Sequence, residues 1–169
     1  MSRIAFRTFG VTVAPLGDPR LAEFGSRGDD IVAALAETPG YIGSIFDNDD
    51  WDSGPWGPYS YTRYHHQEPG APDYDASTLS VWRDLESVFR FAYTSHHLGA
   101  VRRRALWFEP RRWPGYVAWW IGDEELPTWA DSVVRLEHLH DHGPTPFAFD
   151  FHQPFLADGS ACPRPRSNS

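Results

Sequence analysis

The chain has 169 residues, of which 15% are aromatic and eight are tryptophan, so it can form one domain with a ring-rich core. Its 23 acidic and 15 basic residues give a formal charge of −8, which opposes general binding to nucleic acid or to an anionic membrane. All basic residues are arginine and the only cysteine is Cys162, which excludes lysine Schiff-base chemistry, a P-loop and an internal disulfide.

The first residues, MSRIAFRTFGVTV, lack the apolar run and the cleavage site of a signal peptide. No segment reaches about 18 consecutive apolar residues, the length that a membrane-spanning helix needs. We therefore expect a soluble cytoplasmic protein.

The beginning of the chain predicts a strand and a helix. Ile4–Val13 alternates between apolar and polar positions, and a proline-rich turn ends it. Asp18 then stands where a helix cap is needed, and apolar residues recur at helical spacing as far as Ala36. Gly25 and Gly28 could interrupt this helix in its middle.

The next stretch joins a predicted second strand, Tyr41–Phe46, to the least regular part of the sequence, Asp47–Ser77. About thirty residues without strong periodicity indicate either a surface loop anchored by a few rings or a lid. The beginning, DNDDWD, resembles a calcium loop only superficially, because Trp51 and Asp52 stand where a ligand and a glycine are needed. Calcium binding is excluded.

The most strongly patterned stretch is Leu79–Glu109, which predicts a short strand ending at Trp82 and then one long amphipathic helix. Asp84 at the start of the helix and three arginines near residue 104 suit the helix dipole. The residues that recur at spacings of three and four, typical of a face buried against a sheet, are Leu85, Val88, Phe89, Ala92, Tyr93, His96 and Ala100.

The last part of the chain predicts a strand, a helix and a strand. Tyr116–Ile121 is a short apolar run that fits a sheet strand. A helix is expected from Thr128 to the Gly-Pro stop at Gly143, and the alternating Phe147–Phe151 would form the last strand. From Ala157 onward the composition is that of a disordered tail.

This order of elements is the split βαβ pattern, in which two helices are separated by pairs of strands. We therefore expect an α+β fold, a ferredoxin-like antiparallel sheet with helices on one face. It would form a single domain over residues 1–156, with 47–77 as a long loop or lid. A second copy would cover the other face, so the chain would be a homodimer that pairs as a dimeric α/β barrel.

Short motifs crowd the stretch from Leu79 to Phe151: Ser80-Val81-Trp82, Phe91 and Tyr93, His97, Arg102-Arg103-Arg104, Trp107-Phe108, Trp119-Trp120, Arg135-Leu136-Glu137-His138-Leu139 and the closing HGPTPFAFDF. In these motifs the chain resembles a bacterial family of domains of unknown function in the dimeric α/β-barrel superfamily. The resemblance implies that fold. It also leaves two chemistries open, because the superfamily includes haem-dependent enzymes such as chlorite dismutase and cofactor-free quinone-forming monooxygenases.

A haem site needs an imidazole on a rigid element, aromatic surroundings and cations for the propionates. The predicted second helix offers His96 and His97, and the family pattern favours His97 as the axial ligand of the iron. The other residues expected around the cofactor are Trp82, Tyr93, Arg103 and Trp107. In the alternative interpretation, one histidine is a hydrogen-bonded core residue and the other is solvated.

Two further histidines, His138 and His142, lie four residues apart on the predicted last helix, so both imidazoles could meet one metal ion. No third ligand is identifiable in the sequence. Histidines at a helix C-terminus also gain from the dipole and from the free carbonyls, which is the structural alternative.

Three functions are consistent with these features. The first is a haem-dependent oxidoreductase or monooxygenase that acts on a small apolar or aromatic molecule. The second is a cofactor-free monooxygenase or isomerase in which a histidine is the general base. The third is a non-catalytic ligand-binding or assembly protein, in which histidines and rings complete a dimer interface.

Overall fold

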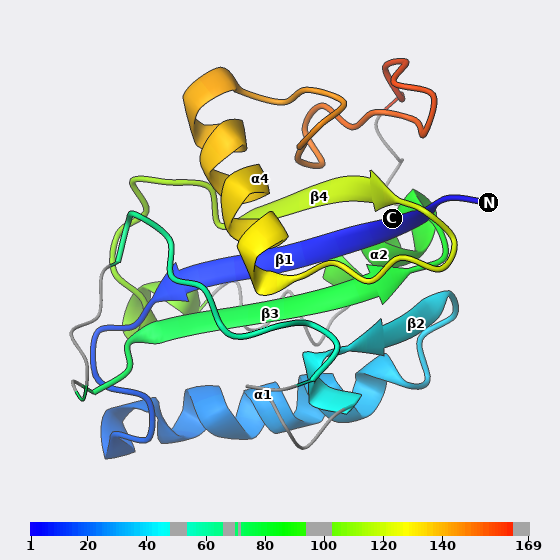
Figure 1. Cartoon of the computed structure of the whole chain (residues 1–169). Coiled ribbons are helices and arrows are strands. Elements are labelled where there is room, and N and C mark those ends of the chain that lie inside the picture. Colours follow the sequence, from blue (N-terminus) through cyan, green and yellow to red (C-terminus); the bar gives the residue numbers. More distant parts are fainter. Residues whose placement is uncertain (48–53, 66–69, 71, 94–102, 164–169) are drawn as a thin grey trace.

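The computed structural model describes residues 1–47, 54–65, 70, 72–93 and 103–163 (Figure 1). Within these ranges the helices and strands are, in chain order, β1 (Arg3–Val11), α1 (Ala22–Leu35), β2 (Tyr41–Ser44), β3 (Asp75–Trp82), α2 (Leu85–Ala92), β4 (Tyr116–Ile121) and α4 (Trp129–His142). Two short 3-10 helices, η1 (Pro19–Leu21) and η2 (Ile45–Asp47), precede α1 and follow β2. Among the described residues, no helix is long and apolar enough to cross a membrane.

The four strands form one antiparallel sheet in the order β2-β3-β1-β4. β1 lies in the middle, where Ile4 pairs with Trp82 of β3 on one side and with Trp120 of β4 on the other. Since α1 connects β1 to β2 and α2 lies between β3 and β4, this is the split βαβ arrangement. The predicted α+β, ferredoxin-like fold is therefore confirmed.

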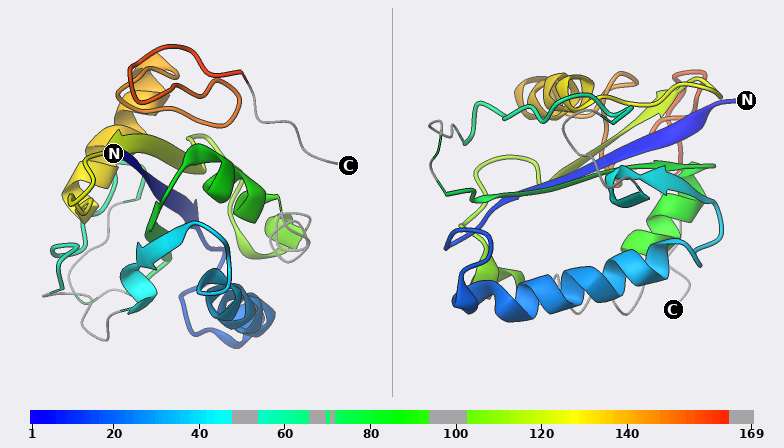
Figure 2. Two further views of the ribbon diagram at one scale, coloured as in Figure 1. Left: turned by 90° about the vertical axis from the view of Figure 1, so that its right-hand side faces the viewer. Right: turned by 60° about the horizontal axis from the view of Figure 1, so that its bottom comes forward.

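Alternation along β1 gives the sheet two buried faces. Ile4 and Phe6 belong to an apolar cluster that includes Val88 of α2. Ala5 and Phe9 belong to a second cluster on the opposite face. Figure 2 shows α1 and α2 on one side of the sheet and α4 on the other.

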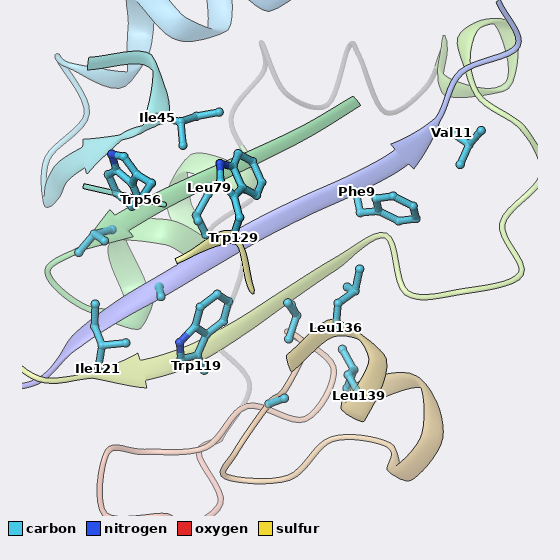
Figure 3. Close-up of a cluster of buried hydrophobic side chains, with 14 residues drawn as sticks. Phe9, Val11, Ile45, Trp56, Leu79, Trp119, Ile121, Trp129, Leu136 and Leu139 are labelled. Atoms are coloured by element: carbon cyan, nitrogen blue, oxygen red, sulfur yellow. The ribbon is translucent and has the colours of Figure 1, made fainter. Parts of the chain in front are cut away.

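The position of α4 corrects the expectation that only a second copy of the chain covers the other face. Leu136 and Leu139 of α4 pack with Trp119 of β4 and with Trp129 at the start of the helix (Figure 3). The apolar stripe of α4 is buried there because the crossover helices already occupy the first face. The homodimer stays a prediction.

Local sequence signals set the ends of the helices. Thr128 caps α4, because its hydroxyl accepts from the N–H of Asp131 and its own N–H donates to the Asp131 carboxylate. Gly143 ends this helix with a φ of 72°, as the sequence predicts. Asp84 caps α2 in the same way, with a hydrogen bond from the N–H of Ser87.

The length of α2 is a second correction. The helix ends at Ala92 instead of continuing to residue 104, and Tyr93 has left the helical region with φ −107° and ψ 13°. Tyr93 was expected on the buried face, but its side chain is 44% exposed, so the buried stripe stops with the helix. Residues 103–107 are helical again, and 94–102 lie outside the described residues.

The structure decides two predictions, the break of α1 at its glycines and the bounds of β4. α1 runs through Gly25 and Gly28 without interruption, so these glycines do not break it. A side chain at either position would meet open space, which indicates an exposed part of the helix. β4 has the bounds that the sequence predicts, Tyr116–Ile121.

The predicted last strand, Phe147–Phe151, is reduced to two isolated antiparallel bridges, from Ala148 to Thr145 and from Phe149 to Ala118. The second bridge attaches this segment to β4. Its two residues exchange backbone hydrogen bonds of 2.8 and 3.0 Å. The chain turns directly afterwards, because the Asp150 carboxylate accepts the N–H of His152 at 2.8 Å. A longer ladder cannot form beyond that turn.

The segment assigned by composition to a disordered tail from Ala157 folds back in its described part. The N–H of Cys162 donates to the carbonyl of Pro154 at 2.9 Å. Gly159 makes the reversal possible with a φ of 83°, a conformation that favours glycine. This hydrogen bond and the turn at Gly159 hold the polar stretch in a defined conformation as far as residue 163.

We expect Gly40→Ala to destabilise the fold more than Gly17→Ala. Both glycines have a φ of 88°, so both substitutions carry backbone strain of about 1–2 kcal/mol. At Gly40 a Cβ would also lie 2.0 Å from Oγ of Ser87, which bonds the cap of α2, whereas nothing lies within 4 Å at Gly17. Urea unfolding should show an additional loss of roughly 1–3 kcal/mol for Gly40→Ala. Equal losses for the two variants would show that the contact of β2 with α2 is not tight.

Candidate functional site

The side chain of Arg7 is fully buried, with 0% of its surface exposed. Its position in β1 places it on the same face as Ala5 and Phe9, beneath α4. Removing a charged group from water is costly unless other groups replace the lost hydration. The surroundings of Arg7 therefore require an explanation.

Two hydroxyl groups and three rings surround the guanidinium group. Nη1 donates to Oγ of Ser132 on α4 at 2.8 Å, and Nη2 donates to Oγ of Ser77 on β3 at 3.3 Å. The ring centroids of Trp129, Phe9 and Tyr59 lie 5.2, 5.8 and 6.0 Å from its central carbon. Among the described residues, Nε of Arg7 has no hydrogen-bond partner.

Asp75 is a second buried ionisable group on this face, and Ser77 connects it to Arg7. Oδ1 of Asp75 accepts the hydroxyl of Ser77 at 2.7 Å, while Oδ2 has no partner among the described residues. Burial raises the pKa of Asp75, although hydrogen bonds from Ser77 and Tyr59 and the charge of Arg7 oppose the shift. Asp75 is thus a carboxyl group that takes up a proton more readily than usual.

Tyr59 reaches the same place from the irregular segment 54–65. Its hydroxyl donates to Oγ of Ser77 at 3.2 Å, and its ring packs edge-on against Trp129 at 4.7 Å. Burial raises the pKa of the Tyr59 hydroxyl, so the group is neutral and can donate a hydrogen bond. Burial also lowers the pKa of Arg7, but a guanidinium stays charged at neutral pH.

These five residues are called the Arg7 cluster: Arg7, Tyr59, Asp75, Ser77 and Ser132. Further buried polar atoms without a partner among the described residues lie on segments that face the same side of the sheet. They are Nε1 of Trp56, Oγ1 of Thr62, Nε2 of His65 and Nε1 of Trp113. Native proteins rarely leave such atoms unpaired, so this side of the sheet has unused capacity to bind water or a polar ligand.

Those site residues predicted from the sequence that the structure describes lie outside the Arg7 cluster. His96 and His97 fall outside the described residues. Trp82 is fully buried, and its indole N–H donates to Oγ of Ser80 at 2.9 Å. The ring of Trp82 packs against Phe91 at 5.0 Å, so Trp82 is a core residue on the α2 face.

The remaining predicted residues do not gather around Trp82. Tyr93 is exposed at the end of α2, where its ring contacts Phe89 at 4.4 Å. Arg103 forms an ion pair with Glu23 of α1. Trp107 is buried in a separate small cluster with Leu21 of η1 and Ala14.

The described members of the predicted haem set are therefore not brought together at one place. Trp82 has its polar atom satisfied inside the core, and the guanidinium of Arg103 is engaged by a carboxylate of the same chain. A group that binds propionates would need a free cation beside an open aromatic surface. The two tryptophans of the predicted set, Trp82 and Trp107, belong to different apolar clusters.

The histidine pair on α4 has a structural explanation. The rings of His138 and His142 lie 4.5 Å apart, and Nε2 of His138 is 3.0 Å from Oγ1 of Thr145 in the following turn. Among the described residues, no group of three or more possible ligands could hold a metal ion. His138 thus attaches the end of α4 to the turn that follows it, and His142 packs against His138.

The sequence contains a signal for Arg7 that alternation alone misses. β1 reads RIAFRTFGV, in which both faces of the strand carry apolar residues. A charge inside a strand that is apolar on both sides must be buried. Asp75 gives no such signal, because it stands near the end of the irregular segment, where the sequence does not show that β3 begins and that the side chain is buried.

Residues 3–164 match the sequence profile of a family described as a domain of unknown function, DUF3291. A family of unknown function is what the motifs between residues 79 and 151 predict. No curated protein matches the chain.

Two solved structures are similar to the chain. One is SnoaB, a cofactor-independent oxygenase from Streptomyces nogalater, which is 12% identical over 75% of this chain and 97% of its own, with a TM-score of 0.43. The other is an asparagine-to-alanine mutant of SnoaB, 18% identical over 74% of this chain and 95% of its own, with a TM-score of 0.39. A likeness of this degree carries no inference about activity.

The raised pKa of Asp75 predicts a pH-dependent effect of Asp75→Asn. Because Asp75 holds its proton more tightly in the folded state, protonation of this group stabilises the folded protein. The contribution is complete below the unfolded-state pKa of about 3.9 and is lost as the pH rises through the folded-state pKa. The variant lacks that titration but keeps an oxygen that accepts from Ser77. In urea unfolding between pH 4 and 8, the stability of the variant relative to wild type should increase with pH, by roughly 1.4 kcal/mol for each unit of the shift. A difference that does not change with pH would contradict the assignment.

Proposed function

The chain belongs to the DUF3291 family, and we propose that it is an acid–base enzyme that binds a small organic anion at the Arg7 cluster. Arg7 would hold an oxygen of the substrate, and Asp75 would take and return a proton. The residues around them suit a flat substrate with an aromatic or apolar body. This assignment gives the role of the base, which the cofactor-free hypothesis gives to a histidine, to Asp75, because Ser77 connects Asp75 to Arg7.

One observation carries the proposal: no carboxylate among the described residues is hydrogen-bonded to the buried guanidinium. A purely structural buried arginine is usually neutralised by direct contact with an acidic group. Arg7 instead has two hydroxyl partners and an unused Nε. Asp75 acts on Arg7 only from a distance, through Ser77, so an anionic ligand at Nε would be the first direct charged partner of the guanidinium among the described residues. A charge-assisted hydrogen bond in such surroundings is strong.

The rings around the guanidinium support the choice of an aromatic or apolar body. Phe9, Tyr59 and Trp129 present ring surface beside the charge. Offset and edge-on contacts with rings favour planar ligands. The cluster thus combines one fixed positive charge with surfaces that exclude water, which strengthens the electrostatic attraction.

The chemistry that suits these groups is removal of a proton from carbon next to a carbonyl. Oδ2 of Asp75 would accept the proton, and Arg7 would stabilise the enolate oxygen. Return of the proton to another carbon is an isomerisation. If the carbanion instead reduces O₂, one oxygen atom enters the substrate as a carbonyl and the other leaves with two protons as water. The haem-dependent alternative and the homodimer remain separate proposals, and neither is needed for these steps.

Replacement of Arg7 by methionine should separate binding from stability. Ser77 and Ser132 keep other hydrogen-bond partners, so Arg7→Met removes a buried charge without creating new unpaired hydroxyls, and stability should be unchanged or higher. Binding of a planar carboxylate such as 2-naphthoate, measured by calorimetry, should weaken about tenfold to a hundredfold.

The matched control is Arg3→Met, which removes an arginine of the same strand that pairs with Asp123 near the surface. This variant should bind 2-naphthoate like wild type, and the neutral 2-naphthylmethanol should bind poorly to both. Exchange of an acidic C–H of a bound keto acid into D₂O, followed by NMR, should disappear in Asp75→Asn. Equal affinity of Arg7→Met and wild type for 2-naphthoate would refute the binding role of Arg7.

A further inference from the structure

The segment 54–65 lies across the face of the sheet that carries the Arg7 cluster, beside α4 (Figures 1 and 2). We propose that residues 54–65 are a lid and that contacts between Arg63–Tyr64 and α4 are the latch that holds it closed. The proposal concerns access to the site and rests on the proposed function. It adds a route by which a ligand reaches a guanidinium that is otherwise sealed.

The inner side of the lid covers the cluster directly. Trp56 and Thr62 are buried, and the ring centroid of Tyr59 lies 6.0 Å from the central carbon of the Arg7 guanidinium. The carbonyl of Trp56 accepts the N–H of Trp129 at 3.0 Å, next to the cap of α4. Since Tyr59 belongs both to the lid and to the cluster, moving the lid would open one side of the guanidinium.

The latch consists of polar contacts with one side of α4 near its end. Arg63 binds both carboxylate oxygens of Asp141, one of them at 2.9 Å, and its backbone N–H donates to Oε1 of Glu137 at 2.8 Å. The hydroxyl of Tyr64 lies 2.7 Å from Nδ1 of His140. Residues 137, 140 and 141 are three and four apart, so they share a face of the helix.

Two features make the latch easy to release. The side chains of Arg63 and Asp141 are 47% and 43% exposed, so water and salt compete for their contact. The described lid residues form neither helix nor strand, and Pro55 and Pro58 cannot donate backbone hydrogen bonds. Segments with such sparse regular bonding open more readily than the core.

Three polar atoms buried beneath the closed lid also bear on how easily it opens. Nε1 of Trp56, Oγ1 of Thr62 and Nε2 of His65 are buried without a hydrogen-bond partner among the described residues. Opening would hydrate these atoms and recover part of the cost of their burial. Against this, opening must separate the rings of Tyr64 and Trp113, which stack at 5.4 Å. The closed state is thus held by this ring contact and the exposed latch, together with the backbone hydrogen bond between Trp56 and Trp129 and the bond from Tyr59 to Ser77.

The test measures access to Arg7 without any ligand. Phenylglyoxal modifies exposed arginines, and peptide mass spectrometry gives the rate at Arg7 relative to the exposed Arg83. We expect slow modification of Arg7 in wild type and a rate about 1.5-fold to fivefold higher in Arg63→Gln and Asp141→Asn, as for loss of an exposed ion pair. The matched control is Arg27→Gln, which breaks an exposed ion pair with Glu23 on α1 and should leave the rate at Arg7 unchanged.

Amide hydrogen exchange of the same proteins distinguishes lid opening from general loosening. Exchange should accelerate in residues 54–65 and stay unchanged in β1 and β3. Added salt should accelerate both readouts in wild type but not in Arg63→Gln. An unchanged rate at Arg7 in both latch variants, or equal acceleration throughout the sheet, would overturn the lid. Because no ligand is used, these outcomes do not depend on whether 2-naphthoate binds.

Discussion

The burial of one guanidinium group is the constraint on which this face of the molecule depends. Arg7 lies at the centre of β1, one of the two inner strands, and its side chain is fully buried. Everything placed above it must supply polar contacts or ring surface in place of hydration. Ser132 on α4, Ser77 on β3 and Tyr59 on the lid each supply part of this environment.

The two faces of the sheet consequently differ in the polarity of their buried side chains. The face beneath α2 is an apolar core in which rings such as Phe6, Phe89 and Phe151 pack against one another. The face beneath α4 mixes rings with ionisable groups and unpaired polar atoms. Uniform apolar packing favours stability, whereas buried polar groups that lack partners are typical of sites that bind something else. The proposed chemistry therefore lies on the α4 face.

The sequence predicts the frame of the fold well, because periodicity and capping act locally. β4, the cap at Thr128 and the stop at Gly143 follow directly from residue patterns. The side of the sheet that α4 covers is not encoded locally, since an apolar stripe does not specify which surface buries it. The early end of α2 at Ala92 is likewise not visible in the local pattern, because apolar residues recur at helical spacing as far as Ala100.

The candidate site was harder to predict for the same reason. Motif matching drew attention to rings and arginines around the second helix, and the structure distributes the described ones, Trp82, Tyr93 and Trp107, over separate surroundings. The Arg7 cluster draws its members from two strands, a helix and the lid, so no short motif contains it. Only the charge within a strand that is apolar on both sides marks its position.

The central claim, that Arg7 is held ready for an anionic ligand, is tested most directly by NMR of the arginine side chains. In ¹⁵N-labelled protein, the Nε–H signal of Arg7 is identified by its loss in Arg7→Met. Addition of 2-naphthoate should move this signal downfield and slow its exchange with water, because Nε gains a charged acceptor. A signal that is already slowly exchanging and does not move on saturation would show that the guanidinium is a closed structural element.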